Sequence, residues 1–266
     1  MPFARLADVS LYYEDAGSGE PLFLISGQGG DHHGWDRIRD DFAARHRVIT
    51  FDHRGTGQSD KPTEPPYSTR GFAKDVIGLM DFLGIERAHA YGISMGGRIC
   101  QWLGIDHPSR IGALVLGCTT PGNLHGVKRP PEVDALMKNR PTDPDAAADF
   151  LMAQMVSTAW SDAHPDYVAF TRERARHRIP EFAQKLHYAA SEGHETWDLL
   201  PSITAPVLVI HGTEDNINPT ANAPLLAGRI PGAELRMIEH GRHGYFIEFA
   251  DEATPAVLDF LARHPL

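Results

Sequence analysis

Short apolar runs recur along the chain, and each ends at a glycine or a polar residue. They occupy residues 22–25, 48–51, 88–93, 114–116, 207–210 and 235–238. Continuous apolar runs of this length are typical of strands buried on both faces of a parallel sheet. A further run at 9–13 alternates apolar and polar residues before Gly17–Gly19, which predicts a strand that leads into a turn.

Helical patterns lie between these runs. In one of them, apolar residues recur every three or four positions from Phe72 to Leu83, and Gly84 ends the helix. A second helix follows residue 94 and stops before Pro108. Strands that alternate with helices imply crossover connections. The chain is therefore predicted to adopt an α/β fold with a mostly parallel central sheet flanked by helices.

Residues 121–196 interrupt this alternation. They contain no convincing strand, and several prolines divide them into helical segments. We expect this segment to form an inserted helical cap at one end of the sheet, on a core made of residues 1–120 and 197–266. Long insertions usually carry function, although a purely packing role is the alternative.

Composition and charge narrow the class of protein. The 266 residues include 25 Lys and Arg against 35 Asp and Glu, a net charge of −10. Because phosphate binding needs a basic surface, this balance argues against a nucleic-acid or anionic-membrane partner. The one basic run, residues 172–178, is broken by Glu173 and is interpreted as the solvated face of a helix.

The sequence predicts a soluble cytoplasmic protein. No run approaches the roughly 18 apolar residues of a membrane span, and the N-terminus resembles no signal segment. Cys100 and Cys118 have apolar neighbours and are expected to be reduced core residues. Oligomeric state, including a homo-oligomer, is left open.

The strongest chemical signal is Gly92–Gly96, which places Ser94 between two glycines. The serine follows an apolar run and precedes a helical pattern. On such a strand–turn–helix corner, a serine stands exposed at the sheet edge and can attack a carbonyl. The plain alternative is a tight turn whose glycines only relieve crowding, so the motif needs a base, an acid and an anion site.

Among the 15 histidines, His243 is the predicted base. It follows the last predicted strand and precedes a helix, so its loop should open on the same sheet edge as Ser94. His240 is the near competitor, and His211 is expected to be structural. Asp215, in the loop after the strand at 207–210, is the predicted acid that orients the imidazole.

Two alternatives to Asp215 as the acid remain at this point. Glu214 is a rival one position away, and Asp215 could instead cap a turn before Pro219. The chain order Ser94, Asp215, His243 is nevertheless the order required in hydrolases whose serine stands on such a strand–turn–helix corner.

An attacked carbonyl develops an oxyanion, which needs hydrogen-bond donors already in place. We predict the backbone N–H of Met95, at the start of the helix, as one donor. Gln28, in the Gly-rich loop 26–30, is the second candidate. That loop contains neither common nucleotide-binding glycine pattern, which argues against a phosphate cradle.

Together these segments resemble the ordered motifs of the α/β-hydrolase superfamily, over nearly the whole chain. The segments are 26–29, 52–59, 92–96, 211–215 and 241–244. The chain is most similar to the capped carboxylesterase, enol-lactonase and cofactor-free perhydrolase group. The resemblance implies the same triad and oxyanion donors, and a structural turn at 52–59. One departure is that the first loop begins Ser26-Gly27 where His-Gly is usual.

The expected activity is hydrolysis of a carboxylic ester or lactone through an acyl-enzyme, without a cofactor or metal. Carbon–carbon bond hydrolysis or perhydrolysis by the same triad is the alternative, and a small-molecule receptor on a hydrolase scaffold is a third reading. The substrate is expected to be small and mainly apolar. The predicted pocket residues are Trp35, Phe150, Met152, Met155, Trp160 and Tyr245.

Overall fold

The fold is built on one eight-stranded sheet. We describe it from a computed structural model, for residues 2–64, 67–139, 141–176 and 179–266. The strands are ordered β1-β2-β4-β3-β5-β6-β7-β8. Their bounds are β1 Phe3–Arg5, β2 Ser10–Gly17, β3 Pro21–Ile25, β4 Arg47–Phe51, β5 Ala88–Ile93, β6 Ile111–Gly117, β7 Val207–Gly212 and β8 Glu234–Ile238.

The sheet is parallel from β4 to β8, and β1 and β2 add an antiparallel edge. Strand β3 pairs with β4 on one side and with β5 on the other. The chain order therefore reverses at β3, and loops after β3 and β5 part in opposite directions there. In open parallel sheets, ligand sites form at the carboxyl end of the strands beside such a switch point.

Helices cover both faces of the sheet. Alternate strand residues supply the two layers, since Phe23 and Ile25 belong to one buried cluster while Leu22 and Leu24 belong to the other. The first cluster includes apolar residues of α2 (Thr69–Phe82), α3 (Met95–Asp106) and α9 (Asn222–Arg229). The second includes those of α1 (Arg39–Ala43), α10 (Tyr245–Glu248) and α11 (Ala250–Ala262).

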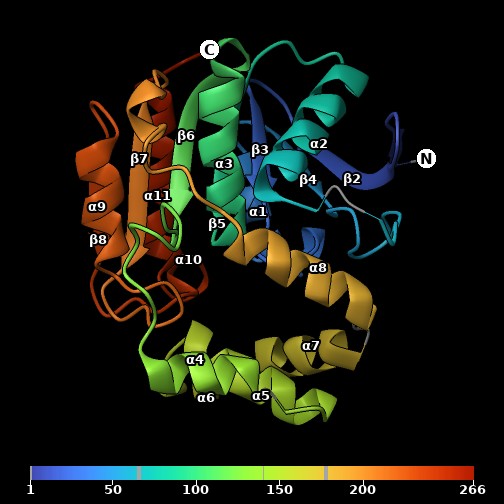
Figure 1. The fold of residues 1–266 in the computed structure, drawn as a ribbon, viewed down its shortest axis with the longest axis vertical. Helices are drawn as coiled ribbons and strands as arrows, with labels where there is room; N and C mark the ends of the chain where they lie inside the picture. Colours follow the sequence, from blue (N-terminus) through green and yellow to red (C-terminus); the bar gives the residue numbers. More distant parts are fainter. Residues whose placement is uncertain (1, 65–66, 140, 177–178) are drawn as a thin grey trace.

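The segment between β6 and β7 is helical and lies at one end of the sheet, away from the C-terminus (Figure 1). We call residues 121–196 the cap. Its helices are α4 Pro131–Lys138, α5 Pro144–Met155, α6 Thr158–Ala163, α7 Pro165–Arg176 and α8 Glu181–Glu192. Helix α8 runs between the other cap helices and the core. None of the described helices is long and apolar enough to cross a membrane.

The sequence predicted most of this architecture correctly. Each of the six continuous apolar runs is a strand or lies within one, and the alternating run begins β2. Gly84 follows α2 with φ +65°, the left-handed conformation that lets a chain leave a helix. Both cysteines are buried and unpaired, as expected of small core residues.

Candidate active site

Ser94 occupies a strained turn between β5 and α3. Its φ of 55° and ψ of −116° lie in a region that non-glycine residues rarely adopt. The two motif glycines make this turn sterically feasible. A Cβ on Gly92 would lie 2.2 Å from the carbonyl oxygen of Gly96, and one on Gly96 would lie 2.1 Å from that of Ile25. The backbone thus holds the half-buried serine at the carboxyl end of a central strand.

His243 and Asp215 meet across two loops of the core. Nδ1 of His243 donates to Oδ2 of Asp215 at 2.8 Å, and both side chains are buried. The other carboxylate oxygen accepts from the backbone N–H groups of Ile217 (2.9 Å) and Asn218 (3.0 Å). The carboxylate is therefore fixed on both sides, which leaves Nε2 of His243 as the free ring nitrogen.

His211 is a neighbour of this pair that sequence reasoning left as structural. Its Nε2 donates to the carbonyl oxygen of Asn218 at 2.8 Å and lies 3.1 Å from Oδ2 of Asp215. Burial alone would raise the pKa of Asp215, but the His243 imidazole and the hydrogen bonds from His211 and His243 hold that pKa well below its ordinary value. Asp215 is therefore a carboxylate at neutral pH.

The rival acid and base lie elsewhere. Nδ1 of His240 and Oε1 of Glu214 are 3.0 Å apart on the exposed surface. Neither is among the described residues that line the cavity beside Ser94, whereas His243 is. Asp215 also turns its loop through the two backbone bonds above, so one side chain both caps the turn and bonds Nδ1 of His243.

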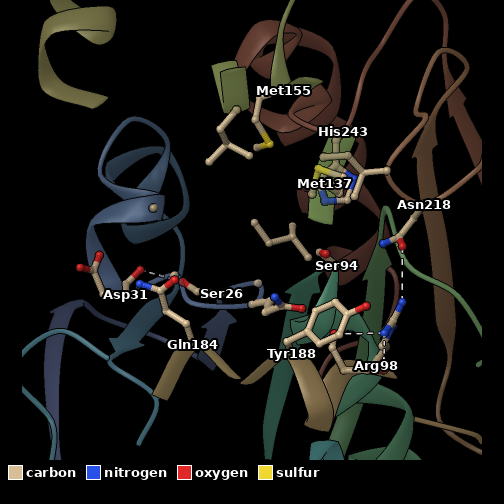
Figure 2. Close-up of a pocket in the computed structure, with 18 of the residues that line it drawn as sticks. Ser26, Asp31, Ser94, Arg98, Met137, Met155, Gln184, Tyr188, Asn218 and His243 are labelled. Atoms are coloured by element: carbon tan, nitrogen blue, oxygen red, sulfur yellow. Dashed lines mark hydrogen bonds between the residues drawn. The ribbon is translucent and has the colours of Figure 1, made fainter. Parts of the chain in front are cut away.

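Ser94 and His243 line one cavity of about 740 Å³, within the range of small-molecule sites. Figure 2 shows them on the same side of this pocket. Among the described hydrogen bonds, none joins Oγ of Ser94 to Nε2 of His243. Catalytic hydrogen bonds of this kind commonly shorten only in the substrate complex.

The loop after β3 approaches Ser94 closely. A Cβ on Gly27 would lie 3.2 Å from Cβ of Ser94, so glycine lets the backbone lie close to Ser94. Gln28 follows it and lines the cavity. Met95 is fully buried at the first position of α3, where backbone N–H groups are free of helical partners. Gln28 and Met95 remain the predicted oxyanion donors.

Ser26, the departure from the usual first loop, takes part in bracing it. Oγ of Ser26 donates to the carbonyl oxygen of Asp31 at 2.8 Å, and the carbonyl oxygen of Ser26 accepts from Nε2 of His53 at 3.0 Å. The cap adds a third contact, because Nδ1 of His187 on α8 accepts from the N–H of Gly29 at 3.3 Å. The loop is therefore held by the core and by the cap together.

The predicted pocket residues need correction. Of the six, Met155 lines the cavity and the other five are not among its described lining residues. Trp35 and Tyr245 are fully buried in the core, where the Tyr245 hydroxyl lies 3.0 Å from that of Tyr91. Its position beside His243 in the sequence suggested a pocket role for Tyr245, but its side chain packs in the core against Phe246.

The three cap residues in that set face other surroundings. Met152 is buried, and Trp160 packs between His164 and Tyr167 with the Arg37 guanidinium 5.0 Å from its ring. Phe150 is partly exposed on α5. Helical periodicity shows that such residues share a face, but it does not show which face meets the cavity.

The cavity is also more polar than predicted. Apolar side chains line it, but so do six charged residues: Asp31, Arg98, Arg129, Arg174, Glu181 and Lys185. Arg174 forms an ion pair with Asp31 from cap to core. The described part of the basic run, residues 172–176 on α7, is thus only in part a solvated face, and residues 177 and 178 lie outside the described residues. Arg172 and Arg176 pair with acids at the surface, whereas Arg174 reaches the site.

Two groups of side chains have the spacing of metal ligands. One is Cys118, Asp215 and His243, and the other is Asp31, His32 and Asp52. In both, a histidine nitrogen already bonds a carboxylate, at 2.8 Å for His243–Asp215 and 2.6 Å for His32–Asp52. In each group, two of the three side chains are thus already hydrogen-bonded to each other.

Comparison with known proteins agrees with this geometry. A model of the alpha/beta hydrolase fold matches residues 20–250. A putative carbamate hydrolase of Variovorax paradoxus is 30% identical over 258 residues, covering 95% of this chain and 96% of its own.

Two solved structures superpose closely. One is described as Est816, an N-acyl homoserine lactone degrading enzyme, with 32% identity, a TM-score of 0.85 and coverage of 98% and 100% of the two chains. The enol-lactonase of Burkholderia xenovorans LB400 has 30% identity, a TM-score of 0.85 and the same coverages. The family match and the fold together show that this chain is a hydrolase of the α/β-hydrolase superfamily.

Proposed function

We propose that the protein hydrolyses small carboxylic esters or lactones through an acyl-enzyme on Ser94. The proposal rests on the arrangement of three residues. Ser94, in a strained turn, and His243 line the same cavity, and Nδ1 of His243 is hydrogen-bonded to Asp215 at 2.8 Å. Lactonase names among similar structures support the same substrate class.

The mechanism follows from these positions. His243 Nε2 takes the proton of Ser94 as Oγ attacks the carbonyl carbon, and Asp215 stabilises the imidazolium that forms. The N–H groups of Met95 and Gln28 bind the oxyanion. When the intermediate collapses, His243 returns the proton to the departing alcohol oxygen. In a lactone, that oxygen stays attached to the acyl chain.

The second half repeats the sequence with water. His243 removes a proton from water as its oxygen attacks the acyl carbon, and the proton then passes to Oγ of Ser94 as the acid leaves. The cavity makes this exchange selective, because the acyl group must fit beneath the cap. No redox group or metal is needed to balance either half.

The direct test is a panel of esters and lactones given to wild type and Ser94→Ala. We expect kcat to fall by about 10⁴-fold or more, since the substitution removes the nucleophile and leaves only oxyanion binding. Ser202→Ala, on an exposed serine outside the cavity, is the matched control and should behave as wild type. Equal turnover by wild type and Ser94→Ala would refute the proposal.

A further inference from the structure

Arg98 is an unusual residue for its position. It lies one turn after Ser94 on α3, with its N–H 3.3 Å from the carbonyl oxygen of Ser94, and its side chain lines the cavity. It is only 5% exposed. A cation near the N-terminus of a helix opposes the helix dipole, and a buried charge is costly without a counterion.

The partners of Arg98 are neutral. Nη1 donates to two oxygens of Ser191, its backbone carbonyl oxygen and, at 3.0 Å, its Oγ. Nη2 lies 3.4 Å from Oδ1 of Asn218. Among the described residues, no carboxylate lies within 4.0 Å of its guanidinium, and its Nε has no hydrogen-bond partner. Burial lowers the pKa of Arg98 to about 10, so the group is still a cation at pH 7.

A second cavity adjoins the first at this residue. Its volume is about 330 Å³, and it shares with the first the residues Arg98, Arg129, Tyr188, Ile217 and Asn218. Figure 2 places Arg98 between Tyr188 and Asn218, on the side of the pocket that holds Ser94. An acyl chain bound to Ser94 can therefore extend along this shared lining toward the guanidinium.

The junction offers two buried donors that lack partners among the described residues. They are Nε–H of Arg98 and the hydroxyl of Thr120, which lines the second cavity. The charged side chains around that cavity are Arg98, Lys128, Arg129, Asp134 and Glu192. Arg129 lies 4.0 Å from Asp134 and 3.7 Å from Glu192. Among the described residues no carboxylate lies that close to Arg98, although the charge of Glu192 acts on it from a greater distance and raises its pKa.

We propose that Arg98 is the centre of a subsite for a carboxylate on the acyl side of the substrate, so that the enzyme prefers esters or lactones of short dicarboxylic acids. A carboxylate would supply acceptor oxygens for these unpartnered donors, and an ionic hydrogen bond to arginine is stronger than a neutral one. The inference rests on the proposed hydrolysis at Ser94. It replaces the expectation of an uncharged substrate.

The test compares two isosteric methyl esters that differ only in charge: monomethyl glutarate and its terminal amide, methyl 4-carbamoylbutanoate. Succinate and adipate analogues cover neighbouring chain lengths. We expect wild type to prefer the carboxylate ester in kcat/KM. Arg98→Gln should reduce that preference by about 10- to 100-fold, mainly through KM, with Arg98→Lys between the two.

Arg70→Gln is the charge-matched control. Arg70 lies on α2 and forms an exposed ion pair with Asp106 of α3. In Arg70→Gln, the preference for the carboxylate ester should therefore stay at the wild-type value. Circular dichroism and Tm establish that each variant is folded. Equal loss on both esters in Arg98→Gln would overturn the proposal, since it would mean that Arg98 only braces α8 through Ser191. Absence of any preference in wild type would overturn it as well.

A binding measurement separates this inference from the proposed function. Calorimetry of glutarate with Ser94→Ala should detect binding that weakens by about 10-fold or more when Arg98→Gln is added. This readout does not need turnover. If the neutral ester is cleaved through Ser94 but glutarate binding is insensitive to Arg98, the hydrolase stands and the subsite falls. If glutarate binds through Arg98 but no ester is cleaved, the subsite stands and the proposed hydrolysis falls.

Discussion

Different interactions stabilise the sheet and the cap. Every residue of β5, β6 and β7 is buried, and the side chains pack into two apolar clusters. By contrast, no residue of α7 is buried, and the helix is attached through ion pairs such as Arg174–Asp31. The reacting groups come from loops of the sheet, whereas the charged side chains around the substrate come largely from the cap.

This difference assigns separate tasks to the two regions. Close packing of the sheet fixes the strained turn at Ser94 and the loops that carry Asp215 and His243, since a packed core tolerates little displacement. The cap contacts the core through hydrogen bonds and ion pairs and through a few apolar side chains such as Met155 and Trp160. We therefore expect its cavity-facing residues to change with less effect on stability. Substitutions in the packed strands should change stability, and those of Ser94, Asp215 and His243 should change kcat. Substitutions of cavity-lining side chains, from the cap or at Arg98, should change KM.

The largest effect is expected for Asp215→Asn in the core. An asparagine can keep the backbone hydrogen bonds from Ile217 and Asn218, but it cannot stabilise the imidazolium of His243 or select its tautomer. We expect kcat to fall by about 10³- to 10⁴-fold, with KM nearly unchanged, in steady-state kinetics on an activated ester. A change of less than tenfold would remove Asp215 from the triad.

The sequence predicted the core better than the cap for a physical reason. Buried parallel strands are continuous apolar runs, and catalytic loops follow them in a fixed order, so Ser94, Asp215 and His243 could be located by their place after a strand. Cap helices carry apolar residues on faces that meet the core, each other or the cavity. Periodicity does not distinguish these, which is why Trp160 and Met152 were misplaced.

Arg98 was missed, and the contact of His211 with Asp215 was not foreseen in its predicted structural role, for a related reason. Both are polar residues within or beside strongly apolar segments, and their roles depend on what lies opposite them in space. The available signal was Arg98 itself: a cation one turn after the nucleophile, in a helix whose other residues from Met95 to Gly104 are also buried. A buried charge of this kind points to a ligand more often than to packing.

A matched pair of leucines tests the comparison directly. Leu116 on β6 is fully buried, and Leu116→Ala should lower the free energy of unfolding by about 3 kcal/mol while KM stays as in wild type. Leu151 on α5 is half-buried and lines the cavity, so Leu151→Ala should cost about 1 kcal/mol but raise KM several-fold. Urea unfolding and ester kinetics measure both; a reversed pattern would contradict the division of tasks.

A smaller effect concerns pH and His53, beneath the oxyanion loop. Burial, with the neighbouring His187, lowers the pKa of His53 to about 4, against about 6.5 in an unfolded chain. Between these values the unfolded state binds more protons, so His53 lowers stability as the pH falls from 6.5 toward 4. Stability should fall between pH 7 and 4.5 by about 2 kcal/mol more in wild type than in His53→Gln. Parallel pH curves from urea unfolding would contradict this.

The central claim is that Ser94 is the covalent nucleophile, and labelling with diisopropyl fluorophosphate tests it most directly. We predict one phosphoryl adduct per chain, located on Ser94 by peptide mass spectrometry, with activity lost in proportion to labelling and no adduct in Ser94→Ala. Labelling at another residue that abolishes activity, or full activity in a chain labelled at Ser94, would contradict the account.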